Sequence, residues 1–432
     1  MGINQLDLLK TRRFLPLFIT QFLGAFNDNV FKNALVILIT YRIAASYGMN
    51  PQILVTVVAG LFILPFFLFS ATAGQLADKY EKSRLISIIK FAEIIIMLLA
   101  TSGFYLHNTL VLLTVLFFLG IQATFFGPLK YAMLPSQLHE EELIAGNGLI
   151  EAGTFIAILL GTILGGLLIL LPFGVALIST AICLFAVLGF ITSLYIPNTH
   201  TAYLEQSISY NFIKETIRVV HYAKKQPDLM LPILAISWFW LIGAVYLAEF
   251  PVFAKDILHA DALVVTFFIA LFSIGIALGS VLCNKLLDGK VQTTFVPLGA
   301  LGMSLFAVDL YFAAGNANMI GLPELITPYQ LLQTLTGWRI VVDLLFIAIC
   351  GGLYTVPLYA LLQKRSDKSH RARVIAANNI INALFMVLAA AATVLMLKMG
   401  YTVKDVFLYI AIINGAVTLF IYLNHAKVGV KT

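Results

Sequence analysis

Charged and amide side chains occupy the middle of the first apolar segment, which runs from Phe14 to Tyr41. Asp28 and Lys32 lie well inside this segment, and Asn29 stands beside Asp28. A charge at mid-membrane costs roughly 2.5 to 3.5 kcal/mol on insertion scales. Because Asp28 and Lys32 are four residues apart, they share a helix face with Gln21 and can neutralise each other. The pattern favours a polar stripe that contacts a transported substrate or protons, with an ion pair that only stabilises packing as the alternative.

Further charges lie inside later apolar segments. Lys90 and Glu93 are three residues apart in the segment Leu85 to Leu106, so they can pair on one helix face. Glu151 lies inside the segment Leu143 to Leu171. Charges in such positions nominate the path of a transported molecule.

A loop motif follows the second apolar segment. It has Gly74, then Asp78 four residues on, then basic residues that include Lys79 and Arg84, and it resembles the signature of the major facilitator superfamily. The glycine lets two helices approach closely, and Asp78 can sit at the N-terminal end of another helix beside an Arg or Lys. We expect this contact to tie two parts of the molecule together in one conformational state. The alternative is a solvated run of charges that only sets the membrane topology.

The composition predicts the elements that must position these residues. Of 432 residues, 60% are hydrophobic and only 11% are charged, whereas a soluble domain has about 25% charged residues. This excludes a soluble enzyme, a disordered chain and a single-span receptor. Twelve apolar segments are long enough to cross a bilayer: Phe14–Tyr41, Gln52–Ala77, Leu85–Leu106, Leu110–Met133, Leu143–Leu171, Phe173–Ile196, Leu229–Phe253, Ala262–Leu287, Thr293–Ala314, Ile340–Leu362, Arg373–Leu397 and Val403–Asn424.

The distribution of basic residues predicts the orientation. Of the 27 Lys and Arg residues, 20 fall on one alternate set of loops and 5 on the other, leaving Lys32 and Lys90 inside apolar segments. By the positive-inside rule, both termini are expected in the cytoplasm. An even number of spans agrees with that expectation.

The domain organisation follows from the longest polar interruption. We expect a six-helix bundle over residues 1–196, a central cytoplasmic loop over 197–228 and a second six-helix bundle over 229–432. Within the loop, Tyr210, Ile213, Ile217 and Val220 recur at helical spacing among basic residues, which suggests an amphipathic helix on the membrane surface. The alternative is a linker between the two bundles that is helical without a role at the membrane.

An internal repeat supports the two bundles. Pro128-Leu129-Lys130-Tyr131-Ala132 is echoed by Pro357-Leu358-Tyr359-Ala360, and Ile144-Ala145-Gly146-Asn147 by Ile375-Ala376-Ala377-Asn378. The copies fall at matching helices of each set of six. This predicts two parallel repeats around an axis along the membrane normal, the arrangement of major facilitator transporters.

Several motifs of the first half resemble one family within that superfamily, the bacterial lysophospholipid transporters. They are Gln21-Phe22-Leu23-Gly24-Ala25-Phe26-Asn27-Asp28-Asn29, Pro128-Leu129-Lys130-Tyr131, and Ala145-Gly146-Asn147-Gly148-Leu149-Ile150-Glu151-Ala152. The likeness is closest to the transporter part of members fused to an acyltransferase and acyl-carrier-protein synthetase. The resemblance adds Lys130 and Asn147 to the candidate substrate-binding or translocation residues. The full set is Asp28, Asn29, Lys32, Lys90, Glu93, Lys130, Asn147 and Glu151.

The resemblance implies a flippase that moves lysophospholipids, such as lysophosphatidylethanolamine, across the inner membrane of a Gram-negative bacterium toward cytoplasmic reacylation. The chain departs from the fused members because it has no acyltransferase motif, so any acylation needs a separate lysolipid acyltransferase. The alternative is a proton-coupled exporter of another amphiphile, a drug or siderophore, driven through Asp28 or Glu93.

Other classes of activity find no support in the residues. The seven histidines form no cluster, and the three cysteines, Cys183, Cys283 and Cys350, fall singly inside apolar runs. We expect no enzyme activity, no metal or cofactor, and no nucleic-acid partner. The expected partners are the lysophospholipid substrate, membrane lipids and the separate acyltransferase.

Overall fold

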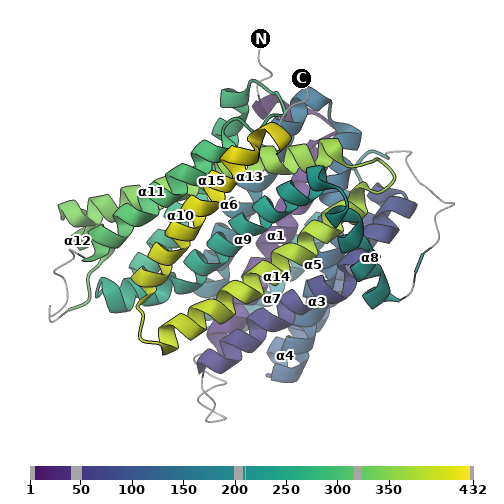
Figure 1. The fold of residues 1–432 in the computed structure, drawn as a ribbon. Helices are drawn as coiled ribbons and strands as arrows, with labels where there is room; N and C mark the ends of the chain where they lie inside the picture. The colour runs from purple at the N-terminus through teal and green to yellow at the C-terminus, as the bar shows by residue number, and fades with distance from the viewer. Residues whose placement is uncertain (1–4, 40–50, 199–207, 210, 316–323, 429–432) are drawn as a thin grey trace.

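The computed structural model describes residues 5–39, 51–198, 208–209, 211–315 and 324–428, and these are almost entirely helical (Figure 1). Twelve described helices match the predicted segments: α1 (Leu15–Leu38), α3 (Pro51–Lys79), α4 (Lys82–Tyr105), α5 (Thr109–Gln137), α6 (Leu143–Ile169), α7 (Gly174–Ser193), α9 (Pro227–Val252), α10 (Ala262–Leu287), α11 (Val296–Gly315), α13 (Leu335–Arg365), α14 (Arg371–Lys398) and α15 (Val403–Val428). The predicted end of the first segment, at Tyr41, lies outside the described residues.

Eleven of these helices are long and apolar enough to cross a membrane. The polar helix α1 is not among them, but its 24 residues make it about 36 Å long, enough for a hydrocarbon core of about 30 Å. It also packs along the membrane-spanning helix α6. The prediction of an all-helical membrane protein with twelve spans is confirmed.

Five shorter elements complete the described chain: η1 (Gln5–Lys10), η3 (Glu140–Glu142), α8 (Phe212–Lys224), η4 (Phe253–Ile257) and α12 (Pro328–Leu332). The helix α8 is the predicted amphipathic helix of the central loop. The Asn211 side chain caps it by accepting a hydrogen bond from the backbone N–H of Lys214 at 2.9 Å. Val219 and Ala223 are its buried apolar side chains. Of the residues used to predict α8, Tyr210 lies outside the described residues.

The helices pack in pairs within two sets. In the first bundle (α1 and α3–α7), α1 packs on α6, α3 on α5, and α4 on α7. In the second bundle (α9–α11 and α13–α15), α13 packs on α10 and α11, and α14 packs on α9. The two bundles meet along α6 with α10 and along α3 with α14.

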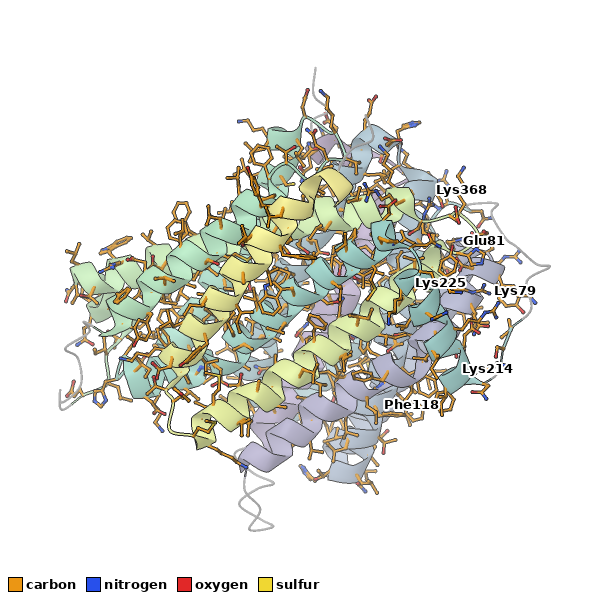
Figure 2. The ribbon with its side chains drawn as sticks, viewed as in Figure 1. Lys79, Glu81, Phe118, Lys214, Lys225 and Lys368 are labelled. Carbon is orange, nitrogen blue, oxygen red and sulfur yellow. The ribbon has the colours of Figure 1, made fainter. Side chains whose placement is uncertain are left out.

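The basic loops gather at one end of the molecule, here called the basic end. Figure 2 shows Lys79, Lys214, Lys225 and Lys368 at this end. The element η1 and the last turns of α15 lie toward the same side of the molecule (Figure 1). Two residues of the charge count, Arg42 and Lys431, lie outside the described residues.

Two hydrophobic cores show where the bundles are joined. One core includes buried residues of both bundles, and its first-bundle members, such as Ala77, Leu134 and Ile144, come from helix ends at the basic end. The other core consists of first-bundle residues alone, such as Val30, Phe104 and Ile182, and lies toward the opposite end. Within the described residues, the bundles therefore share a core at the basic end and not at the opposite end.

Candidate translocation site

A cavity of about 380 Å³ lies between the two bundles. The first bundle contributes most of its wall, and α9, α13 and α14 of the second bundle contribute the rest. The lining residues are Gln21, Gly24, Ala25, Asp28, Phe62, Ile63, Phe66, Gln122, Ala123, Phe126, Gly127, Lys130, Tyr131, Thr154, Trp240, Tyr359, Asn379, Asn382 and Met386. The lining combines aromatic and aliphatic side chains with amides and two ionisable groups.

The two ionisable groups that line the cavity, apart from tyrosines, are Asp28 on α1 and Lys130 on α5. One carboxylate oxygen of Asp28 is buried and accepts no hydrogen bond from the described residues. The Lys130 ammonium lies over the Tyr131 ring, 4.7 Å from its centroid. An acid and a base therefore face the same cavity, and a zwitterionic head group offers a partner for each.

Asp28 and Lys32 attract each other as opposite charges, as predicted, but they do not form a direct contact. Among the described residues, no ion pair within 4.0 Å joins these two side chains. The Lys32 ammonium instead lies over the ring of Phe62, 4.3 Å from its centroid. Phe62 lines the cavity and Lys32 does not. The aromatic face offers the ammonium a favourable partner, and Asp28 remains available to the cavity.

The wall from the second bundle is uncharged. It is formed by Trp240 on α9, Tyr359 on α13, and Asn379, Asn382 and Met386 on α14. These side chains offer hydrogen-bonding groups and apolar surface without a fixed charge. The charge of the cavity is therefore concentrated on the first bundle.

Aromatic rings from the two bundles meet at one boundary of the cavity. Tyr131 and Tyr359 stack with ring centroids 4.5 Å apart and planes 5° apart. The Trp240 indole N–H donates a hydrogen bond to the Tyr359 hydroxyl at 2.9 Å, and Phe155 stacks on Trp240. These rings join the bundles between the cavity and the basic end.

Glu151 lies behind this ring stack. The Tyr131 hydroxyl donates a hydrogen bond to one Glu151 carboxylate oxygen, and the Glu151 side chain is fully buried. Its other carboxylate oxygen has no hydrogen-bond partner among the described residues. The structure therefore places Glu151 outside the cavity lining, linked to it through Tyr131.

Lys90 and Glu93 form the predicted pair on α4, and both are fully buried. Glu93 also accepts hydrogen bonds from Asn27 of α1 at 3.0 Å and Gln122 of α5 at 2.8 Å. Gly24 leaves room for the lysine, because a Cβ there would lie 2.9 Å from its ammonium. The pair ties α1, α4 and α5 together behind the cavity wall, and only Gln122 and Gly24 of this group reach the lining.

Asn29 faces α6 instead of the cavity. Its side-chain amide donates to the Ala25 carbonyl at 2.7 Å, and a Cβ at Gly161 of α6 would lie 3.0 Å from the Asn29 Cβ. One turn further, Asn33 donates to the Thr162 carbonyl at 2.6 Å. The Asn33 amide therefore fastens α1 to α6, and Asn29 packs against α6 while hydrogen-bonding within α1. The polar side chains of α1 are thus divided between α4, the cavity and α6.

The loop motif joins the bundles at the basic end. The Asp78 carboxylate accepts hydrogen bonds from the backbone N–H groups of Ala372 and Arg373, at 2.9 and 3.2 Å, in the first turn of α14. A Cβ at Gly74 would lie 2.8 Å from the Ala376 Cβ and 2.9 Å from the Arg373 Cα. The expected contact of a close-packed glycine and an aspartate at another helix's N-terminus is present.

The two basic residues of the motif take other positions. Arg84 is exposed, and its backbone N–H donates to the Glu81 cap of α4 at 2.7 Å. The Lys79 ammonium lies 5.8 Å from the centroid of the Tyr80 ring. Within the described residues, Asp78 forms its ion pair with Arg373 of α14, whose Nε lies 3.9 Å from the carboxylate.

Asn147 takes part in the same closure. Its side-chain amide exchanges two hydrogen bonds with that of Gln363 on α13, at 2.8 and 2.9 Å, and both side chains are fully buried. Nearby, Lys364 pairs with Glu140 across the bundles. Asn147 is therefore placed in the contact between the bundles and is not among the residues that line the cavity.

Sequence reasoning missed several residues of the site. Gln122, Tyr131, Trp240, Gln363 and Arg373 were not among the candidates. The internal repeat could have identified two of the second-bundle lining residues, because it aligns the candidate Lys130 with Tyr359 and the candidate Glu151 with Asn382. Both of these second-bundle residues line the cavity.

Two helical bundles that enclose a central cavity and join at one end define a membrane transporter of the alternating-access type. Residues 17–390 match the model of the Major Facilitator Superfamily. The lysophospholipid transporter LplT of Escherichia fergusonii is 30% identical over 81% of this chain and 80% of that protein. The same transporter of Shigella sonnei is 28% identical over 81% of this chain and 80% of that protein. The chain belongs to the Major Facilitator Superfamily and, within it, to the lysophospholipid transporter family, whose members are transporters and not enzymes.

Solved structures share the fold. The human organic anion transporter MFSD10 (TETRAN) matches with a TM-score of 0.73 and 13% identity, over 94% of this chain and 99% of that one. A bacterial homologue of the iron transporter ferroportin, in an outward-facing state, matches with a TM-score of 0.65 and 13% identity, over 95% and 98% of the two chains. These likenesses show the architecture alone.

Proposed function

We propose that this protein moves lysophospholipids across the bacterial inner membrane by alternating access, so that they can be reacylated in the cytoplasm. The observation that carries the proposal is an amphiphilic cavity between the bundles in which Asp28 and Lys130 are the only carboxylate and ammonium among the described lining residues. The named activity of the relatives from Escherichia fergusonii and Shigella sonnei supports the substrate class.

The chemistry of the cavity suits the parts of a lysophosphatidylethanolamine. Asp28 attracts the ammonium of the head group, and Lys130 attracts the phosphodiester. The other candidates for these roles do not line the cavity: Glu151 accepts a hydrogen bond from Tyr131, Lys90 pairs with Glu93, and Lys32 lies over the Phe62 ring. We therefore assign the proposed head-group site to Asp28 and Lys130.

The single acyl chain needs an apolar wall. Phe62, Ile63 and Phe66 of α3, Phe126 of α5 and Met386 of α14 supply one within the same cavity. Burying each CH₂ of an acyl chain contributes about 0.8 kcal/mol. Aromatic and thioether side chains suit a flexible hydrocarbon because they impose little directional demand on it.

The transport cycle follows from the position of the contacts. We place the basic end in the cytoplasm by the positive-inside rule. The bundles, residues 1–196 and 229–432 with the central segment 197–228 between them, are then joined on the cytoplasmic side. We infer from this contact an outward-facing state. Rocking of the bundles would separate Asp78 from α14 and Asn147 from Gln363, and would expose the cavity to the cytoplasm.

Transport by the purified protein tests the proposal. Proteoliposomes that contain the protein should accumulate labelled lysophosphatidylethanolamine, and Asp28→Asn and Lys130→Gln should each reduce the rate at least about tenfold. Asp256→Asn and Lys255→Gln are matched controls, because these exposed residues of η4 do not line the cavity. Wild-type rates in both cavity variants would contradict the site, and no transport by the wild type would contradict the function.

The same assay separates the proposal from a proton-coupled exporter of another amphiphile. Transport of lysolipid without a pH gradient is expected here. Proton flux that depends on a drug or siderophore, and not on lysolipid, would favour the exporter.

A separate acyltransferase is part of the proposal. Co-expression of such an enzyme should raise the yield of diacyl lipid only when the transporter is present.

A further inference from the structure

A second polar cavity lies at the basic end, away from the translocation cavity. Its volume is about 210 Å³, and it lies between α8 and the beginning of α14. The lining residues are Glu215, Arg218, Val219, His221, Tyr222, Lys225, His370 and Arg373, none of which lines the cavity between the bundles. We refer to it as the α8 pocket.

The α8 pocket carries a surplus of positive charge. Its lining includes the cations Arg218, Lys225 and Arg373 and the single acid Glu215. Glu215 is buried and lies 3.5 Å from Arg218, so that it offsets one cation. Asp78 pairs with Arg373 at 3.9 Å, which leaves Lys225 as the lining cation for which the described residues form no ion pair. The two histidines of the lining add hydrogen-bonding groups without requiring another charge.

The Arg373 guanidinium has an N–H donor that is not used in a hydrogen bond by the described residues. The side chain is 10% exposed, and its Nε is buried without a hydrogen-bond partner among the described residues. Asp78 is 3.9 Å away, but the two Asp78 oxygens already accept backbone N–H groups of α14. A guanidinium with five N–H donors and an unpaired nitrogen, facing a cavity, is suited to an anionic oxygen ligand.

The walls of the pocket are held in place by contacts between the two elements. Tyr222 of α8 stacks on His370, with ring centroids 5.2 Å apart and planes 16° apart. The Tyr222 hydroxyl also donates to Asp367 at 3.3 Å. The α8 pocket is therefore a formed cavity between packed elements, and not a gap between loose loops.

The surroundings of the pocket identify the source of the anion. On α8, Ile213 and Ile217 are 59% and 65% exposed, one turn apart. Exposed apolar residues on a basic amphipathic helix enter the boundary between lipid head groups and acyl chains. An anionic lipid in that boundary would present its phosphate to Arg218 and Lys225 on the adjoining face of the same helix.

We propose that the α8 pocket binds the phosphate of an anionic membrane phospholipid, with Arg218, Lys225 and Arg373 as its cationic ligands. Arg218 lies on α8 and Arg373 on α14, so the bound lipid would bridge α8 and the first turn of α14. The site is separate from the substrate cavity, and its occupancy does not depend on whether lysophospholipid is transported.

Binding of defined lipids to the full-length protein in detergent tests the proposal. Thermal stability and lipid retention in native mass spectrometry are measured against dioleoyl phosphatidylglycerol, dioleoyl phosphatidylcholine and sodium phosphate. The test variant is Arg218→Gln with Lys225→Gln. The matched control is Lys214→Gln with Lys224→Gln, which removes the same charge from exposed positions of α8 that do not line the pocket.

Phosphatidylglycerol should stabilise the wild type and the control, and its apparent affinity should fall about thirtyfold in the test variant, at about a fivefold loss for each cation. Lys225→Gln alone, at an exposed residue, should lose about fivefold without disturbing the fold. Equal losses in the test and control variants, or equal binding of phosphatidylcholine, would overturn the site. Saturable binding of sodium phosphate with no effect of phosphatidylglycerol would overturn the lipid as its source.

Discussion

The carboxylate of Asp78 on α3 accepts a hydrogen bond from the backbone N–H of Ala372, in the first turn of α14, at 2.9 Å. The two residues are 294 positions apart in the chain. An isolated helix leaves its first N–H groups unpaired and carries a partial positive charge at that end. Asp78 supplies from the first bundle the cap that α14 lacks in its own sequence, because its N-cap residue, His370, makes no capping hydrogen bond through its side chain.

Replacing Asp78 by Asn should weaken the closure at the basic end. A hydrogen bond to a charged group contributes about 1.5–3 kcal/mol, so the ratio of closed to open molecules should fall by roughly tenfold or more. Cross-linking between Glu140→Cys and Lys364→Cys, in a background without the three native cysteines, would measure this, because these residues form an ion pair across the bundles.

Glu81→Gln is the matched control for Asp78→Asn. Glu81 also caps a helix with its carboxylate, accepting the backbone N–H groups of Ser83 and Arg84 at 3.1 and 2.7 Å. That helix is α4, in the same bundle. The control should lower the stability of α4 and leave the cross-linking yield unchanged, and equal yields in both variants would contradict the role assigned to Asp78.

Gly74→Ala should separate the bundles for a steric reason. The new Cβ would lie 2.9 Å from the Cα of Arg373, which is backbone and cannot rotate away. Gly60→Ala on the same helix is the control, because a Cβ there meets no atom of the described residues within 4 Å. The cross-linking yield and the transport rate should fall for Gly74→Ala and stay at the wild-type level for Gly60→Ala. Wild-type cross-linking and transport in both variants would contradict the prediction, because α3 and α14 would then have moved apart enough to accommodate the new Cβ without opening the bundles.

Asn147 and Gln363 should behave as one unit. Each side chain is both donor and acceptor to the other in a buried contact, so removing one leaves the other unpaired at a cost of about 1–3 kcal/mol. Asn147→Ala and Gln363→Ala combined should therefore cost clearly less than the sum of the single changes, measured as the free energy of unfolding in detergent. Additive effects would place Asn147 elsewhere, for example at the substrate.

The fold could be predicted from the sequence because its elements are set by local properties. The apolar segments located the helices, and the central run of Ile213, Ile217 and Val220 located α8. The Asp78 contact could also be anticipated, since a glycine and an aspartate at that spacing suit a close approach to a helix end. What could not be predicted was the partner, because Ala372 and Arg373 carry no signal that pairs them with Asp78.

The candidate site was predicted less completely, for a physical reason. A polar residue inside a membrane helix must find a partner, but the helix periodicity does not say which neighbour supplies it. On α1, Asn27 turns to Glu93, Asp28 to the cavity and Asn29 towards α6. The proximity of Asp28 and Lys32 in sequence predicted a pair, whereas the nearby Phe62 ring receives the lysine.

Variants of Glu93 and Lys90 distinguish a purely structural role of this buried pair from a role in the transport cycle. Glu93→Gln removes the only ion-pair partner that the described residues give Lys90, and an unpaired buried charge costs about 3–5 kcal/mol. We therefore expect low expression and a Tm reduced by several degrees. Replacing both residues, as Lys90→Met with Glu93→Gln, removes the stranded charge and keeps an oxygen acceptor for the amides of Asn27 and Gln122. This double change should restore most of the stability. If the pair only holds α1, α4 and α5 together, this double variant also transports lysolipid. A stable double variant that does not transport would show that the pair takes part in the transport cycle.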